Sequence, residues 1–207
     1  LIVRGSGAKM SVFYPHASFV FGANKYLVQD KLNTQVPTPD NDFFCVREHF
    51  GVRCDTENER VGMYWARPGG GSRYQGLYLA DAWGECNLFV SGDTDGQGGA
   101  CVGATFSDIW LANTRPDIGA GTTNSRVLNG LELQGCYSIT FNNLIVDYQS
   151  NDTDYGVDDL AGYGVKITGS AGIVFNGINA EGNPKPFYLS NAQGTTINGG
   201  AIYRKGL

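Results

Sequence analysis

The chain has 207 residues, which is enough for one domain with a buried core. A net charge of −5 argues against nucleic acid as a partner, and the apolar runs are too short for a membrane span. Glycine supplies 30 residues without a period of three, which excludes collagen and favours an all-β structure with many corners.

Residues 1–23 have the pattern of a first coil in a repeating structure. The opening Leu1-Ile-Val-Arg-Gly-Ser matches the segments that begin at Leu131 and Val165, in which apolar residues alternate with polar ones before a Gly. The chain lacks an initiator Met and begins inside such a coil, and the ends of a solenoid need a cover. We therefore expect residues 1–207 to be a fragment of a longer protein.

Residues 24–76 interrupt this pattern. Prolines, a charged run and a Pro-Gly-rich segment predict loops, whereas residues 43–52 and 61–65 have the composition of strands. A long insertion from a rigid scaffold is a frequent place for function or for subunit contact. We expect an inserted subdomain at about residues 24–76.

The repeating pattern returns after this stretch. Residues 77–82 look like a coil start, and residues 104–112 align with residues 139–147. In that alignment Ser107 takes the place of an Asn that recurs in the later copies. A ladder of stacked Asn side chains would then begin only at Asn142.

Three copies of a repeat follow, and they align without a gap over seventeen positions. They cover residues 131–147, 165–181 and 187–203. In the first two copies six spaced positions are apolar, so each copy contains short strands with one apolar face. The twelfth position is Asn in every copy, and the Asn or Gly that follows it suits a left-handed bend.

This repeat predicts a parallel β-helix. A single copy cannot bury its own core and must stack on its neighbours, as repeats do in solenoids. The strands are short, the corners are Gly or Asn, and the copies show no helical period. The copies begin 34 and 22 residues apart, and the whole difference lies in one connecting loop. A constant coil with variable loops is typical of this architecture.

The coil starts, the Asn ladder and the segments Leu128-Asn-Gly-Leu-Glu-Leu-Gln-Gly135 and Ile139-Thr-Phe-Asn-Asn-Leu144 resemble bacteriophage tailspikes of the pectate-lyase-like β-helix superfamily. This resemblance implies a right-handed helix, a homotrimer and a place in the virion. It also implies binding, and usually cleavage, of a bacterial surface polysaccharide such as a capsule or an O-antigen. Because scaffold residues carry the resemblance, it implies no catalytic residue at a given position.

The seventeenth position of the repeat faces outward and places two acids, Asp147 and Glu181, on neighbouring coils. Coils about 4.8 Å apart could bring the two carboxyl groups to roughly 5–6 Å, and glycosidases use two carboxyl groups beside the scissile bond. Repulsion between them would raise one pKa and make an acid available. We predict Asp147 and Glu181 as catalytic; the alternative is two solvated surface acids. The reserve candidates are Glu132, Asp108 and Asp154.

The outward position of the first strand predicts a second row, formed by Ile2, Tyr78, Glu132, Lys166 and Tyr188. Glu132 and Lys166 would form either a plain surface ion pair or part of a sugar-binding face. On the same reasoning Trp110 faces outward and suits a sugar platform or a trimer contact. The predicted substrate-binding residues are Lys166, Tyr188, Tyr78, Trp110 and Tyr203.

Three functions fit these residues. The first is a depolymerase that acts as a glycoside hydrolase, and the second is a non-catalytic receptor-binding or structural tailspike module. The third is a lyase for a uronate-containing polysaccharide, with Lys166, Arg73, Arg115 and the two histidines as candidates for its cation and base.

Neither a metal nor another cofactor is expected. The Asp-rich segments that begin at Asp93 and Asp152 lack the Gly and the Glu of a complete calcium loop. The five cysteines are odd in number and contain no CxxC pair, so we expect free thiols.

Overall fold

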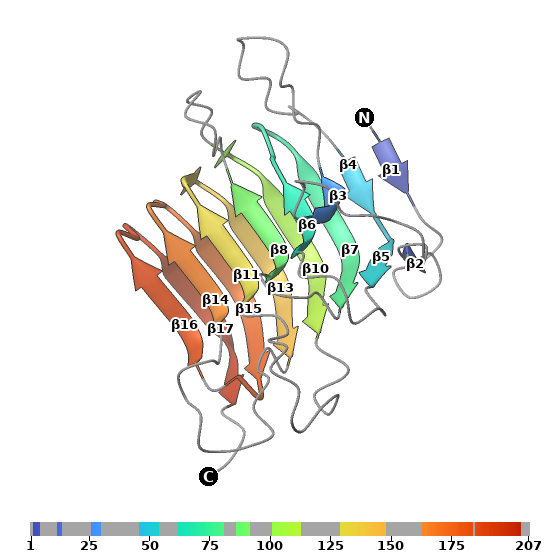
Figure 1. Cartoon of the computed structure of the whole chain (residues 1–207). Coiled ribbons are helices and arrows are strands. Elements are labelled where there is room, and N and C mark those ends of the chain that lie inside the picture. Colours follow the sequence, from blue (N-terminus) through green and yellow to red (C-terminus); the bar gives the residue numbers. More distant parts are fainter. Residues whose placement is uncertain are drawn as a thin grey trace.

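The computed structural model describes residues 2–4, 12–13, 26–29, 46–53, 62–80, 86–91, 101–112, 129–147, 163–183 and 185–203, with side chains from residue 46 onward except at 62, 63 and 65. All named elements in these ranges are strands, and every strand pair is parallel. None of the described segments forms a helix long and apolar enough to cross a membrane. The chain is a parallel β-helix, as the repeat predicts, and its coils follow one another from β1 to β17 (Figure 1).

Two stacked sheets make up the helix. Sheet A is formed by β1 (Ile2–Arg4), β4 (Val46–Glu48), β7 (Arg73–Ala80), β10 (Thr105–Ala112), β13 (Thr140–Asp147), β15 (Val174–Glu181) and β17 (Thr196–Tyr203), together with β2 (Val12–Phe13) and β5 (Gly51–Arg53). Sheet B is formed by β3 (Tyr26–Gln29), β6 (Gly62–Ala66), β8 (Cys86–Ser91), β11 (Asn129–Gln134), β14 (Tyr163–Thr168) and β16 (Lys185–Ser190). A small third sheet at the turn from B to A pairs β9 (Cys101–Val102) with β12 (Cys136–Tyr137).

The register confirms the alignment of the repeats. In sheet B, Leu131 pairs with Val165, which pairs with Phe187 on the next coil. In sheet A, residues 105–112 pair with residues 140–147 at the positions that the sequence alignment predicts. Equivalent positions of successive copies are therefore direct neighbours in space.

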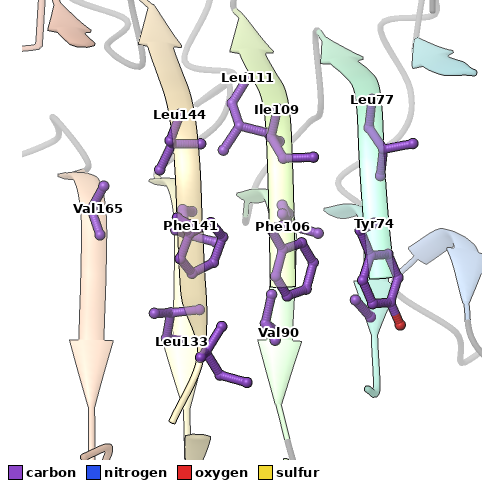
Figure 2. Close-up of a cluster of buried hydrophobic side chains, with 14 of the residues drawn as sticks. Tyr74, Leu77, Val90, Phe106, Ile109, Leu111, Leu133, Phe141, Leu144 and Val165 are labelled. Atoms are coloured by element: carbon purple, nitrogen blue, oxygen red, sulfur yellow. The ribbon is translucent and has the colours of Figure 1, made fainter. Parts of the chain in front are cut away.

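A stack of aromatic rings runs through the core between the sheets. The ring centroids lie 4.4 Å apart for Tyr74 and Phe106, 4.8 Å for Phe106 and Phe141, and 5.2 Å for Phe141 and Phe175. All four side chains are fully buried, and Figure 2 shows three of the rings on neighbouring strands. Burial stabilises each by about 1.5–3 kcal/mol, and each ring pair adds about 0.5–1.5 kcal/mol.

Sheet A bends on six successive coils at a residue with left-handed backbone conformation, which lies between β4 and β5 on the first of these coils and inside the strand on the other five. The φ angles lie between 54° and 73° at all six of these positions, which are His49, Gly76, Asp108, Asn143, Gly177 and Gly199. This bend lets one continuous strand cover two sides of the helix. It confirms the left-handed position that the repeat predicts after the ladder Asn.

The Asn ladder forms beside this bend. Asn198 Nδ2 donates to Asn176 Oδ1 at 3.0 Å, and Asn176 Nδ2 donates to Asn142 Oδ1 at 2.9 Å. Asn142 Nδ2 donates in turn to Ser107 Oγ at 3.3 Å. The stacked Asn side chains therefore begin at Asn142, as expected, and the hydrogen bonds continue one coil further to Ser107, because a serine hydroxyl also accepts a hydrogen bond.

Three expectations about the first half of the chain differ from the structure. The described part of residues 24–76 does not form a separate subdomain, because its strands belong to sheets A and B. The segment 77–82 is not a coil start, since Leu77–Ala80 is the second half of β7 and pairs with residues 109–112. Residues 2–4 likewise belong to sheet A. A period-two apolar pattern tells which side chains point inward, but it does not tell which sheet a strand joins.

Three of the five cysteines lie in the described part of the chain. Cys86, Cys101 and Cys136 are buried free thiols, as the sequence predicts, and Cys45 and Cys54 lie outside the described residues. Cys101 and Cys136 are register partners on neighbouring coils. Burial raises the pKa of the Cys101 thiol, and the adjacent Cys136 raises it further, so this side chain remains protonated and acts as a small apolar group.

Replacing Phe141 by Ala should lower the free energy of unfolding by about 3–5 kcal/mol, because it removes the ring between Phe106 and Phe175. Chemical denaturation followed by circular dichroism measures this change. The outward-facing neighbour provides a control, since Thr140→Ala should change stability by no more than about 0.5 kcal/mol. Equal effects of the two substitutions would contradict a stacked core.

Candidate functional site

The outer face of sheet A carries two rows of side chains beyond the bend. In β13, Leu144 and Val146 are buried, whereas Ile145 and Asp147 are partly exposed on the opposite face. The first row contains Tyr78, Trp110, Ile145, Asn179 and Ala201. The second row contains Ala80, Ala112, Asp147, Glu181 and Tyr203. We name the group formed by Tyr78, Trp110, Asp147, Glu181 and Tyr203 the acid–aromatic face.

Asp147 is held in place by an indole. Trp110 on the preceding coil donates its Nε1–H to Asp147 Oδ2 at 2.8 Å. Partial burial raises the pKa of Asp147, and the negative charge of Glu181 raises it further, whereas the Trp110 hydrogen bond acts in the opposite direction. Together these three effects favour the protonated form of the Asp147 carboxyl group. Asp147 can therefore hold a proton at a higher pH than an ordinary Asp can.

Glu181 is the register partner of Asp147 on the next coil. Its side chain is exposed to water, whereas that of Asp147 is only partly exposed. At a coil spacing of about 4.8 Å, the negative charge of Glu181 contributes to the raised pKa of Asp147. The structure therefore brings together the two acids that the repeat predicts as a pair, in two different environments.

Aromatic side chains flank this pair. Tyr78 and Trp110 pack edge to face, with ring centroids 5.4 Å apart and an interplanar angle of 75°. Tyr203 follows Glu181 on the next coil and is 59% exposed. Edge-to-face contact fixes the two inner rings, and the exposed phenol extends the face past the acids.

Tyr78 occupies a different place from the predicted one. We expected it beside Lys166 and Tyr188, but its register partner is Trp110 on sheet A. On sheet B its expected place belongs to Phe89, which pairs with Glu132 and is buried. The error follows from reading residues 77–82 as a coil start.

The outer face of sheet B carries the other predicted binding residues. Glu132, Lys166 and Tyr188 occupy equivalent positions on three successive coils. Lys166 Nζ contacts Glu132 Oε1 at 2.8 Å, which confirms the predicted ion pair. Glu132 is therefore charge-compensated, and it lies on a different sheet from Asp147 and Glu181.

Asp108 lies apart from the acidic pair. It occupies the left-handed bend of β10, where its carboxylate accepts a hydrogen bond from Asn143 Nδ2 at 2.9 Å. The equivalent bend residue on the next coil is four positions before Asp147, a distance of about 13 Å along a strand. Asp108 has therefore no direct contact with the acidic pair.

The remaining predicted residues give no metal site in the described part of the chain. The structure there contains no group of three His, Cys, Asp or Glu side chains that could hold a metal ion. The Asp-rich segments that begin at Asp93 and Asp152 lie outside the described residues, as do Asp154, His16 and Arg115. His49 lies at a bend on sheet A, and Arg73 is exposed at the start of β7.

Sequence reasoning missed three residues near these surfaces. Tyr163 contacts Tyr188, with ring centroids 4.8 Å apart, and Asn129 donates from Nδ2 to Glu132 Oε2 at 3.1 Å. Asn179 lies on the first row of sheet A with a buried side-chain oxygen that has no hydrogen-bond partner. Tyr163 and Asn129 precede their repeats by two residues, so extending the seventeen-position alignment backward would have found them.

Asp147→Asn should raise stability at neutral pH. A folded pKa above the unfolded one means that Asp147 contributes stability below the unfolded pKa, and that this contribution is lost as the pH rises through the folded pKa. The variant should therefore exceed the native chain by up to about 1 kcal/mol near pH 7, since solvent screens a partly exposed group. The difference should shrink at about pH 3. Urea denaturation at both pH values measures it, and a difference that grows in acid would contradict the raised pKa.

Trp110→Phe should raise the pKa of Asp147 further, because it keeps an aromatic ring and removes the N–H group that stabilises the carboxylate. Titration of the Asp147 carboxyl carbon by NMR measures this shift. Tyr188→Phe on sheet B is the control and should leave the titration unchanged. A lower pKa in the Trp110 variant would show that the indole does not stabilise the ionised form.

Comparison of the chain with protein-family models, curated protein sequences and solved structures finds no match. The parallel strands and stacked aromatic core show a β-solenoid without assigning it to a family. The chemistry of the two outer faces has to be inferred from their own side chains. Those side chains place an acidic pair between the partly buried ring of Trp110 and the exposed ring of Tyr203 on an all-β scaffold.

Proposed function

We propose that the chain is the scaffold of a depolymerase that binds and hydrolyses a bacterial surface polysaccharide. The observation that carries this proposal is the hydrogen bond from Trp110 to Asp147, which holds an acid with a raised pKa beside the exposed Glu181. Two carboxyl groups in different environments are what glycoside hydrolysis requires. A phage tailspike is the setting that the sequence resemblance suggests.

Asp147 takes the role of general acid. Its carboxyl group donates a proton to the oxygen of the scissile glycosidic bond as that bond breaks. Trp110 orients the carboxyl through Oδ2, and partial burial keeps the proton on it. The alkoxide charge that would otherwise develop on the leaving sugar is neutralised by this proton transfer.

Glu181 takes the complementary role at the anomeric carbon. A spacing of about 5 Å suits retaining enzymes, in which the second carboxylate attacks the anomeric carbon and forms a glycosyl-enzyme ester. The register pairing of Asp147 with Glu181 favours that spacing. Water then displaces the ester, and the Asp147 carboxylate recovers its proton from this water.

The aromatic rings supply binding. Apolar faces of pyranose rings pack on exposed aromatic side chains, and the exposed Tyr203 is the register partner of Glu181 on this face. Trp110 is bound to Asp147, which favours a part in the site over a part in subunit contact. Assembly as a homotrimer in the virion remains a proposal that rests on the resemblance to tailspikes.

A lyase is less compatible with these contacts. A lyase needs a cation and a base beside a uronate, whereas Lys166 is paired with Glu132 and lies on a different sheet from the acidic pair. A non-catalytic receptor-binding module is the second candidate, since exposed aromatic rings suffice for binding.

Digestion of a panel of capsular and O-antigen polysaccharides tests the proposal. New reducing ends without ultraviolet absorbance from unsaturated uronate are expected, and their formation should decline as the pH rises and Asp147 loses its proton. Asp147→Asn and Glu181→Gln should each lower the rate by about 10²-fold or more. Glu48 is an acid on β4, outside the acid–aromatic face, and Glu48→Gln is the matched control that should leave the rate unchanged.

Each other outcome has a distinct meaning. Cleavage that survives both substitutions would overturn the acidic pair as the catalytic site. Unsaturated products would indicate a lyase instead. Binding of glycans without any cleavage would favour the receptor-binding module.

A further inference from the structure

We propose that the outer face of sheet B holds a second sugar site, which selects an acidic sugar residue. The acidic-sugar site consists of Asn129, Glu132, Tyr163, Lys166 and Tyr188. It rests on the proposed function only in taking a polysaccharide as the ligand. It is separate from the acid–aromatic face, because its residues belong to β11, β14 and β16.

Two tyrosines form the platform of this site. The rings of Tyr163 and Tyr188 lie with centroids 4.8 Å apart and an interplanar angle of 37°. Tyr188 is 38% exposed, so part of its ring is open to a ligand. Lys166 is the register partner of Tyr188, which places an ammonium group on the strand next to the ring. A ring face beside a cation suits a pyranose that carries a carboxylate.

Lys166 is held in place by a chain of hydrogen bonds. Its Nζ donates to Glu132 Oε1 at 2.8 Å, and Glu132 Oε2 accepts from Asn129 Nδ2 at 3.1 Å. Asn129 is buried, and its Oδ1 accepts from the backbone N–H of Tyr163 at 3.0 Å. The buried amide thus links the platform to the ion pair, and Asn129 and Lys166 each hold one oxygen of the Glu132 carboxylate.

The ammonium group retains capacity for a ligand. An ammonium group has three donors, and one of them points to Glu132. The Lys166 side chain is 29% exposed. Lys185 is the register partner of Tyr163 and adds a second positive charge near the platform.

The acidic-sugar site and the acidic pair meet at one corner of the helix. Glu181 ends β15 and Lys185 begins β16, so three residues connect the two faces. Asn183 in this turn is fully buried and donates from Nδ2 to the carbonyl oxygens of Val146 at 2.8 Å and Glu181 at 2.9 Å. The corner is thus tied to both coils of the acidic pair. A polysaccharide bound at the pair could extend around it to Lys166.

Affinity electrophoresis through gels that contain polysaccharides tests this inference without any cleavage. Alginate, hyaluronan and polygalacturonate serve as acidic probes, and the carboxyl-reduced form of each serves as its neutral partner. At least one acidic polymer should retard the chain, and its reduced form should not. Equal retardation by both forms, or retardation by no acidic polymer, would overturn the inference.

Two substitutions of opposite expected sign separate binding from a structural role. Lys166→Met should weaken binding of the acidic polymer about three- to tenfold, since it removes the cation. Glu132→Gln should strengthen binding about two- to fivefold, because it removes the competing carboxylate from Lys166 and can keep the Asn129 contact. If the ion pair only stabilises the fold, both variants should weaken binding in parallel with a lower melting temperature, and that result would overturn the inference.

The two proposals fail separately. If the chain binds acidic polymers better than their reduced forms but cleaves no glycan, the acidic-sugar site is supported and the hydrolase is contradicted. If the chain cleaves its glycan but binds acidic and reduced polymers equally, the hydrolase is supported and the acidic-sugar site is contradicted.

Discussion

In-register stacking of parallel strands is the constraint on which the rest of this structure depends. Because the strands pair in parallel, each side chain has the equivalent side chain of the next coil as its neighbour at about 4.8 Å. Inside the helix this places Phe106, Phe141 and Phe175 in one aromatic stack. At the bend it forms a ladder from Asn142 and Asn176. On the outer face it forms an acidic pair. These three features have a common geometric cause, although their energies differ.

Stacking stabilises rings and amides but destabilises adjacent carboxylates. Apolar rings gain contact area with each added coil, and each Asn can donate to one neighbour while it accepts from the other. Two ionised carboxyl groups in the same relation repel one another. In the native structure partial burial raises the pKa of Asp147, the Trp110 hydrogen bond offsets part of the rise, and the charge of Glu181 adds to it. Under the proposed function, this arrangement supplies a carboxyl group that keeps its proton beside a second acid.

In the two proposals, the outer face of sheet A cleaves the polysaccharide and the outer face of sheet B recognises its acidic sugar. Sheet A presents the acids with Trp110, and sheet B presents Lys166 with Tyr188. On sheet B the stacked charges are opposite in sign, so Glu132 and Lys166 attract each other where Asp147 and Glu181 repel. The buried Asn183 donates to the carbonyl oxygens of Val146 and Glu181, so it links the end of β15 to both coils of the acidic pair. One polysaccharide chain could therefore be bound by its charge on one face and cleaved on the other.

The sequence by itself determined the parallel β-helix and the alignment of its last three coils. It also determined the Asn ladder and the pairing of Asp147 with Glu181, because a gapless repeat of parallel strands makes equivalent positions neighbours in space. It also predicted the ion pair of Glu132 and Lys166. Only the tertiary structure decided which sheet each early strand joins, and with it the place of Tyr78 beside Trp110. The period-two pattern is the same in both sheets, and the loop lengths in the first half vary too much to count coils. The Trp110 contact to Asp147 and the Asn129 contact to Glu132 also required the structure, since each depends on where a long side chain ends and not on its position in the repeat.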